Sequence, residues 1–341
     1  MGSSCENLNY NVLIFFFLKS LVFVRSIVSC NMYVFSFFRE FAPALHLAVS
    51  EDLLHWSEIN NEEPILEPMV GGKYWRDPFI IRDIQGTFHL LCTDGWSSPF
   101  ICHAFSQNLI NWSDQSLLHV MKNFPSSKNA WAPEACYNHL KQEYLIFWSS
   151  TVIDGFPEHK NKPKDYQNHR IYACTTKNFK EYSDPFLYLD PGYNVIDASM
   201  GFNGSYYLMA FKDERAKDTY FVDEKARKHI LFGIAKDPMG PWDLRSFPIS
   251  HSLYSEKQSQ TIENPTEYWA EGPSVFWNNA DQSWYVFYEY FRSHKYGCAR
   301  SSDLVNWENL DSKVIMPPGV KHGTVFEVND EEIIKKLQSK L

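Results

Sequence analysis

The sequence predicts an all-β fold, a five-bladed β-propeller built from four-stranded antiparallel blades. Two observations lead to it: a short motif that ends in an aromatic residue occurs five times, and a hairpin pattern alternates with it. Aromatic residues make up 16% of the 341 residues, a composition that favours strands. A β-sandwich or a pair of β-domains is the alternative, and the regular fivefold period argues against both.

The aromatic motif runs from small residues through Ser, Thr or Lys and then Asp or Asn to a hydrophobe and a final Trp or Tyr. Its final aromatic residues are 56, 70, 60 and 65 positions apart, so one supersecondary unit recurs along the chain. We expect these aromatic side chains to lie in the core. The copies are LAVSEDLLHW (47–56), HAFSQNLINW (103–112), ACTTKNFKEY (173–182), GIAKDPMGPW (233–242) and CARSSDLVNW (298–307).

The hairpin pattern places a polar residue, usually an acid, before an apolar strand, a turn and an aromatic strand. A truncated fifth copy (321–330) lacks a following strand, and we expect the segment 32–38 to complete its blade and close the ring. A short helix is predicted over 330–341, and 155–168 and 213–229 are predicted to be polar loops that border a cleft. The four full copies are 76–93, 132–150, 196–212 and 270–290.

The first 30 residues differ from the rest. The apolar stretch 11–30 is interrupted by Lys19 and Arg25, which argues against a transmembrane span. Its length and the small residues near Cys30 fit a secretory signal or a lipoprotein cleavage box, so a secreted or surface-anchored location is expected. A misplaced start codon or an internal strand is the alternative, and the protein would then be cytoplasmic. We expect residues 31–341 to form a single catalytic domain.

Charge and cysteine content narrow the function. The net charge is −9 and no Lys/Arg cluster is present, which argues against nucleic-acid binding. The seven cysteines include no C-x-x-C pair, so neither a zinc site nor a dense disulfide framework is expected. Cys92, Cys102, Cys136 and Cys174 fall in strand-like runs and are predicted to be buried. Whether Cys92 and Cys102 form a disulfide stays open, as does the oligomeric state.

Four acids and a histidine precede the first strands of the hairpins. Because the innermost strands of a propeller line one axis, residues at equivalent repeat positions are expected to meet at one end of it. Crowded, desolvated carboxyls have shifted pKa values, so one can stay protonated while another is ionised. Glycosidic hydrolysis needs that pair: an acid for the leaving oxygen and a base for water. The five residues are Asp77, Glu134, Asp197, Glu271 and His322.

The ordered motifs resemble glycoside hydrolase family 43, the five-bladed arabinosidase and xylosidase family. The resemblance covers about residues 32–328 and rests on Arg76-Asp77-Pro78-Phe79, Trp131-Ala132-Pro133-Glu134, Ile196-Asp197-Ala198-Ser199, Glu271-Gly272-Pro273 and His322-Gly323-Thr324-Val325. It implies that Asp77 is the general base, Glu271 the general acid and Asp197 the residue that orients the acid and tunes its pKa. It also implies an inverting mechanism, a pocket role for His322, no required cofactor, and in some members a calcium ion near that histidine.

Other residues are candidates for binding an oligo- or polysaccharide substrate. Trp131 and Trp96 could stack on a sugar face, since aromatic rings suit the C–H surfaces of sugars. Lys212 and Arg292 end aromatic strands and could bind hydroxyls, while Glu134, longer than the usual Asp of that motif, is given a structural or sugar-binding role.

Three other functions are alternatives. A sucrose- or fructan-cleaving propeller would carry an Asn-Asp-Pro-Asn-like nucleophile motif in its first blade, and none is present. A catalytically inactive glycan-binding propeller is disfavoured by the three intact acids. A protein-interaction propeller of the WD or kelch type has shorter repeats and gives no reason for carboxylates to align.

Overall fold

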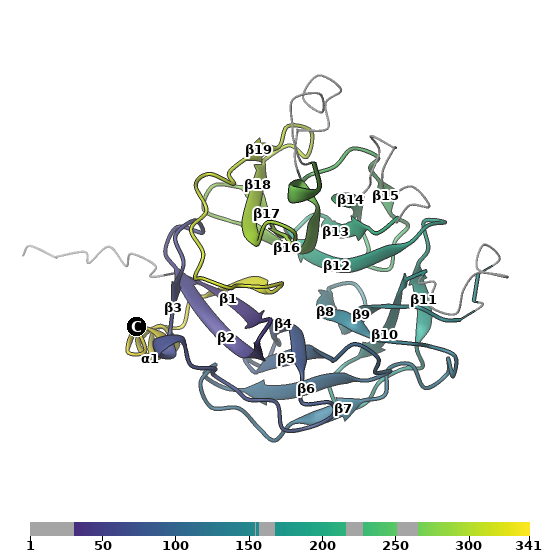
Figure 1. Cartoon of the computed structure of the whole chain (residues 1–341), viewed down its shortest axis with the longest axis horizontal. Coiled ribbons are helices and arrows are strands. Elements are labelled where there is room, and N and C mark those ends of the chain that lie inside the picture. The colour runs from purple at the N-terminus through teal and green to yellow at the C-terminus, as the bar shows by residue number, and fades with distance from the viewer. Residues whose placement is uncertain (1–30, 154, 157–167, 216–227, 251–264) are drawn as a thin grey trace, which may run out of the picture. The chain divides into compact units, whose positions relative to one another are not determined.

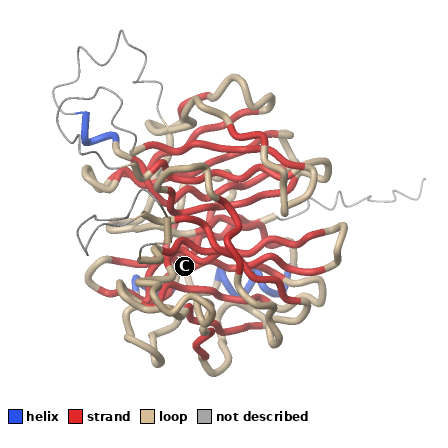
Figure 2. The backbone as a smooth tube through the Cα atoms, turned by 90° about the vertical axis from the view of Figure 1, so that its right-hand side faces the viewer, coloured by secondary structure: helices blue, strands red, loops and turns tan. Residues whose placement is uncertain are grey.

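Twenty strands form five four-stranded antiparallel sheets in the part of the chain that the computed structural model describes, residues 31–153, 155–156, 168–215, 228–250 and 265–341. Figure 1 shows these sheets arranged radially around one centre, and Figure 2 shows that strands make up most of the body in the perpendicular view. The fold is a five-bladed β-propeller. The proposed leader (1–30) and most of the two polar loops lie outside the described residues.

Four blades are continuous in sequence, and each begins with its innermost strand. They comprise β4 (Trp75–Arg82), β5 (Phe88–Asp94), β6 (Ile101–Ser106) and β7 (Ser116–Leu118); β8 (Trp131–Asn138), β9 (Glu143–Ser150), β10 (Arg170–Thr176) and β11 (Phe186–Leu189); β12 (Val195–Phe202), β13 (Tyr207–Asp213), β14 (His229–Ala235) and β15 (Asp243–Leu244); and β16 (Ala270–Asn278), β17 (Ser283–Tyr290), β18 (Lys295–Ser301) and β19 (Glu308–Asn309).

The remaining blade combines segments from opposite ends of the described chain. Strand β20 (Thr324–Val328) pairs with β1 (Met32–Arg39), which continues into β2 (Ala42–Ser50) and β3 (Ser57–Glu58). The sequence predicted that one N-terminal strand would complete this blade, but three strands of the blade come from the N-terminal side. The reason is that the first aromatic motif already forms the outer part of a blade. The predicted terminal helix is present as α1 (Glu331–Gln338), capped by the Asp330 carboxylate, which accepts bonds from two backbone N–H groups.

The aromatic motif builds a tight turn. In the first copy, the Ser50 hydroxyl accepts hydrogen bonds from the backbone N–H groups of Asp52 and Leu53, and Leu53 has φ +69°. The indole N–H of Trp56 then donates to the carbonyl of Leu53 at 3.0 Å. A hydroxyl and a carboxylate or amide thus satisfy the backbone of a left-handed turn. Trp56 is buried, and the other final aromatic side chains are partly buried against the core clusters.

The hydrophobic core is divided into five clusters, most of which join neighbouring blades. In one of them, Phe79 and Leu91 pack with Ile146, Trp148 and residues around them. In the described part of the chain, the short 3₁₀ helices η1 (Asn60–Glu62) and η5 (Pro265–Tyr268) lie in connections. Among the described residues, no helix is long and apolar enough to cross a membrane.

The described cysteines behave as small core residues. Cys92, Cys102, Cys136 and Cys174 are buried, as predicted, and so is Cys298. Cys92 and Cys102 face each other across β5 and β6, but both are free thiols.

Candidate active site

A bulge in each of four innermost strands sets the directions of the polar side chains. In β4, β8, β12 and β16 the strand contains one more residue than its partner requires, and the residue in the bulge has a positive φ. These residues are Asp77 (φ +50°), Ala132 (+47°), Asp197 (+55°) and Gly272 (+57°). For a residue other than glycine this conformation is uncommon, and it occurs both in tight turns and at functional sites.

The bulges correct the expectation that all four acids share one repeat position. Asp77 and Asp197 occupy the bulge itself, whereas Glu271 precedes it and Glu134 follows it by two residues. Because alternate residues of a strand point to opposite sides, this displacement redirects side chains. The structure therefore brings three of the four acids together and separates Glu134.

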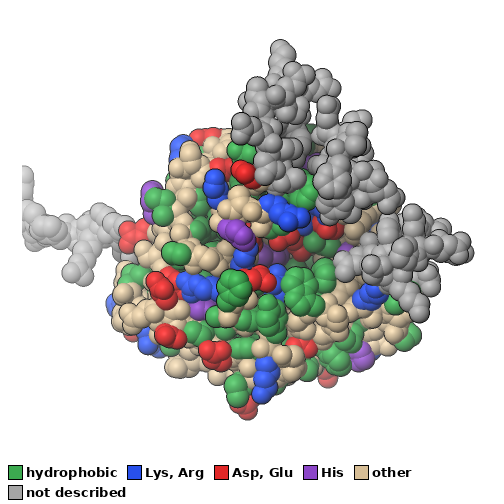
Figure 3. Space-filling model, in the orientation of Figure 1, with side chains coloured by type: hydrophobic (Ala, Val, Ile, Leu, Met, Phe, Trp, Pro, Cys, Tyr) green, Lys and Arg blue, Asp and Glu red, His purple; other side chains and the backbone are tan. Residues whose placement is uncertain are grey.

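Asp77, Asp197 and Glu271 line one pocket of about 120 Å³, together with His322. Trp131 and Trp96, the candidates for stacking on a sugar, also line it. The indole N–H of Trp131 donates to the carbonyl of Trp96 at 3.0 Å, and Trp96 remains 55% exposed. Figure 3 shows acidic, basic and histidine side chains gathered near the middle of the visible face.

The Asp77 carboxylate is held in its ionised form. Burial opposes its ionisation, but His322, Arg76 and Thr93 outweigh burial and hold the pKa of Asp77 below its ordinary value. Nδ1 of His322 lies 3.3 Å from Oδ1, and the Thr93 hydroxyl donates to Oδ2 at 2.7 Å. Burial lowers the pKa of His322, yet Asp77 and the other nearby acids raise it to about 9, so the pair is an ion pair at neutral pH.

Asp197 is in a different electrostatic environment. Burial, with the charges of Glu271 and Asp77, raises the pKa of Asp197 to about 6 against the opposing charges of His322 and Lys212. Its Oδ2 accepts a hydrogen bond from the backbone N–H of Gly272 at 3.1 Å, and its own N–H donates to the Ser149 hydroxyl. Asp197 thus anchors the backbone next to Glu271.

Two of the predicted binding residues, Lys212 and Arg292, do not line this pocket. Lys212 is only 2% exposed and donates to Oε2 of Glu271 at 2.7 Å, so its ammonium is engaged by carboxylates rather than available to sugar hydroxyls. Arg292 is exposed over the rings of Trp269 and Phe291 and is not part of the pocket lining.

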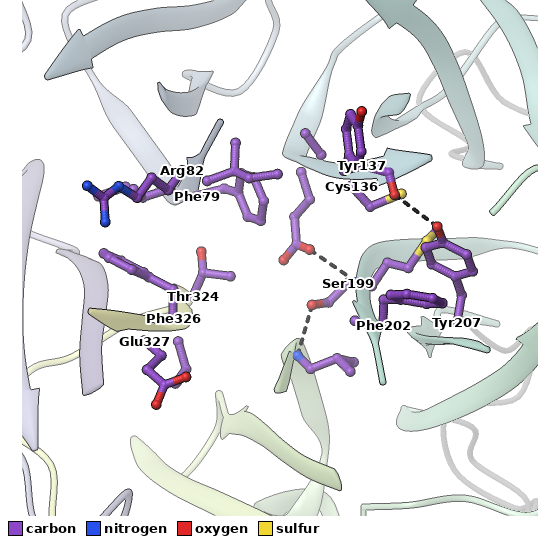
Figure 4. A pocket seen from close by; sticks show the side chains of 18 of the residues that line it. Phe79, Arg82, Cys136, Tyr137, Ser199, Phe202, Tyr207, Thr324, Phe326 and Glu327 are labelled. Atoms are coloured by element: carbon purple, nitrogen blue, oxygen red, sulfur yellow. Dashed lines mark hydrogen bonds between the residues drawn. The ribbon is translucent and has the colours of Figure 1, made fainter. Parts of the chain in front are cut away.

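Glu134 lines a separate cavity of about 310 Å³. Figure 4 shows this cavity, with Ser199 and Thr324 beside its central space and Phe202 and Tyr207 on one side. Glu134 is 4% exposed and accepts a bond from the Met200 N–H, and burial raises its pKa to about 8. Burial outweighs this hydrogen bond and keeps Glu134 protonated at neutral pH, as a structural residue between two blades.

The pocket also contains charged residues that sequence reasoning missed. Glu289 lies directly opposite Glu271 in the β16–β17 pairing and binds Lys321 at 2.5 Å. Burial and the charge of Glu271 raise the pKa of Glu289 to about 7, although Lys321 opposes this. Arg76 packs over the rings of Phe38 and Trp96 and pairs with Glu40. Because the β16–β17 hairpin pairs Glu289 with Glu271, counting residues across the predicted hairpin could have identified Glu289 from the sequence.

The described residues provide no obvious ligand set for a metal. Among them, no three His, Cys, Asp or Glu side chains gather in a way that could hold an ion. His322 directs Nδ1 at Asp77, and a protonated imidazole is not a metal ligand. The described side chains around His322 therefore do not fit a calcium ion.

Comparison with known proteins places the chain in a family. A family model described as "Probable glycosyl hydrolase domain", of the group related to glycoside hydrolase family 43, matches residues 29–333. The chain belongs to this family. A curated α-L-arabinofuranosidase from Bifidobacterium longum subsp. longum is 24% identical to this family member over 184 residues, 48% of the chain. The match spans only 17% of that relative's length.

Solved structures share the fold of this glycosyl hydrolase family member. A GH43_1 enzyme from Xanthomonas citri, in complex with xylose, superposes with a TM-score of 0.54 at 12% identity, covering 77% of this chain and 80% of that one. An endo-1,4-β-xylanase from Bacteroides thetaiotaomicron gives a TM-score of 0.52 at 11% identity, covering 86% and 93%. At such identities the likeness extends to the propeller and not to the substrate.

Proposed function

We propose that the chain is an inverting glycosidase that hydrolyses O-glycosidic bonds of pentosyl residues in plant-type polysaccharides or oligosaccharides, as an α-L-arabinofuranosidase or a β-xylosidase. The observation that carries the proposal is the single pocket that contains Asp77, Asp197 and Glu271. The family assignment and the names of the relatives support the same chemistry and the choice of sugars.

In the proposed reaction, Glu271 in its protonated form donates to the leaving oxygen while Asp77 takes a proton from water on the opposite face of the sugar. The environment of Asp77 supports the base role, because His322 and Thr93 favour its ionised form. Asp197 supports the acid indirectly, since its bond to the Gly272 N–H fixes the backbone beside Glu271. Trp96 and Trp131 offer ring faces to the bound glycan.

The proposed reaction needs no cofactor. The substrate is an extended glycan, and we propose that a secreted or surface-anchored chain meets it outside the cell. Detection of the processed chain in the culture medium or membrane fraction of the source cells would test this location, and an unprocessed chain in the cytosol would contradict it.

The test is turnover of a panel of aryl α-L-arabinofuranosides, β-D-xylosides and β-D-galactosides by the wild type, Glu271→Gln and Asp77→Asn. Glu134→Gln is the matched control, because it makes the same substitution at a buried acid outside the pocket. We expect a pentoside to be cleaved, with kcat/KM falling about 10²–10⁴-fold in Glu271→Gln, most severely for poor leaving groups.

The anomeric form of the first product, followed by NMR, tests inversion. A product with retained configuration would exclude the proposed roles of Asp77 and water. No turnover of any glycoside by folded wild type, together with tight binding of a xylan or arabinan, would instead establish the glycan-binding alternative.

A further inference from the structure

A buried lysine contacts the side chain proposed as the general acid. Lys212 extends from β13, directly opposite Ile196 of β12, and its side chain is almost completely shielded from solvent. Its ammonium donates to Oε2 of Glu271 at 2.7 Å and lies over the ring of Phe291 at 4.5 Å. Glu271 is therefore held at a fixed place on the pocket wall by a group that does not itself line the pocket.

The same ammonium has a second anionic partner. Oε2 of Glu214 lies 2.8 Å from Nζ of Lys212, and the other oxygen of Glu214 pairs with Lys228. Lys228 is itself buried. The four side chains thus form a series of contacts of alternating charge, Glu271, Lys212, Glu214 and Lys228, that begins at the pocket.

This arrangement resolves a conflict in the proposed chemistry. An ammonium beside a carboxylate favours the ionised form, but a general acid must carry a proton when the substrate binds. If Lys212 had Glu271 as its sole partner, protonation of Glu271 would leave a buried, unpaired cation, which is strongly unfavourable. With Glu214 in contact, Lys212 keeps an anionic partner whichever form Glu271 takes.

We propose that Lys212 is a positioning residue that fixes the Glu271 carboxyl in the pocket, and that Glu214 supplies the counter-charge that allows Glu271 to carry a proton. This inference rests on the proposed function, because it assigns Glu271 the role of general acid. Burial disfavours the charged form of Lys212, but Glu214, Glu271 and Asp197 raise its pKa, so the ammonium stays charged during turnover.

Other charged groups face the Glu271 carboxyl from the strands packed against it. Among the described residues they are Asp197 on β12, Lys228 next to β14, Glu289 on β17, Tyr296 on β18, and Glu40, Arg76, Asp77, Lys321 and His322 around the pocket. The variants below change none of them, so opposite effects of the two substitutions can be assigned to Lys212 and Glu214.

The experiment compares the pH dependence of kcat/KM in the wild type, Lys212→Met, Glu214→Gln and the control Lys180→Met, which removes an exposed lysine. Two aryl pentosides, one with a good and one with a poor leaving group, are used. Loss of the positive charge in Lys212→Met should move the alkaline limb, where the acid loses its proton, to higher pH. Loss of the negative charge in Glu214→Gln should move it to lower pH.

We also expect both variants to lose at least tenfold in kcat for the poor leaving group and much less for the good one, while Lys180→Met behaves as the wild type. Shifts of the alkaline limb in the same direction, or unchanged limbs in folded variants, would overturn the inference. If Lys212→Met does not fold, the sign of the Glu214→Gln shift decides alone. Failure of the proposed function shows separately, as unimpaired turnover by Glu271→Gln.

Discussion

Gly272 offers a quantitative test of how closely the pocket is packed. It has φ +57°, and a Cβ built there would lie 2.6 Å from Cγ of His322. An ordinary contact begins at 3.4 Å, so in Gly272→Ala the imidazole must retreat by about 0.8 Å. That ring pairs with Asp77 at 3.3 Å, and the backbone N–H of Gly272 is the group that Asp197 binds.

Gly204→Ala is the matched control, because Gly204 has φ +89° and nothing within 4 Å of its added Cβ. Both variants should lose roughly 1–2 kcal/mol of unfolding free energy from the left-handed backbone. Gly272→Ala should lose about 1–3 kcal/mol more by overpacking. A displacement of nearly 1 Å in a catalytic site typically costs about 10²-fold in rate, and we expect that loss in kcat/KM for Gly272→Ala alone.

Urea unfolding and turnover of an aryl pentoside measure the two effects. Equal stabilities and full activity in both variants would refute the close packing of His322 against Gly272.

Three further predictions concern ionisation and metals. Because the pKa of His322 rises from 6.5 to about 9 in the folded protein, its charge stabilises the fold below pH 6.5 and this contribution disappears as pH rises through 9. The wild type should therefore be more stable than His322→Gln at pH 6, and this difference in unfolding free energy should shrink by about 3 kcal/mol at pH 10. A difference that stays constant with pH would contradict the ion pair. Burial raises the pKa of Glu134 from 4.5 to about 8, so the wild type should lose several kcal/mol of unfolding free energy relative to Glu134→Gln as the pH rises from 4.5 to 8. The kcat/KM of Glu134→Gln should stay within twofold of the wild type. Parallel stability curves for the two proteins would show that Glu134 ionises freely. Incubation with EDTA should leave the proposed turnover of an aryl pentoside unchanged, and a loss restored by Ca²⁺ would establish a required ion.

The fold could be predicted because its signal is local and repeated. Four of the five copies encode a turn in which a hydroxyl and an acid or amide accept hydrogen bonds from nearby backbone N–H groups, as in Ser50–Trp56, and in the first three copies the aromatic N–H or O–H also donates to a nearby backbone carbonyl. Such bonds depend on residues two to four positions apart, so they are visible in the sequence. The number of blades followed from counting the motif.

The candidate site could be predicted only in part, because side-chain direction depends on the bulges. Asp77, Asp197 and Glu271 were correctly expected in one pocket, but Glu134 was expected there too and lies in another cavity. The extra residue in each innermost strand changes which side chain faces the pocket, and no simple pattern of apolar residues reveals it. Lys212 was misjudged for a related reason: its acidic partners come from a loop and from the neighbouring blade.

The blade shared between the two sides of the chain has a consequence for protein synthesis. Strands β1, β2 and β3 leave the ribosome before the other strands of the propeller, whereas β20, which covers the inner edge of β1, is made after all of them. Until then β1 presents unpaired backbone groups, a template on which other chains can pair. His322, just before β20, arrives equally late. A nascent chain therefore has neither a closed ring nor the cation that pairs with Asp77, and a ribosome stalled before residue 322 should release an inactive, aggregation-prone product.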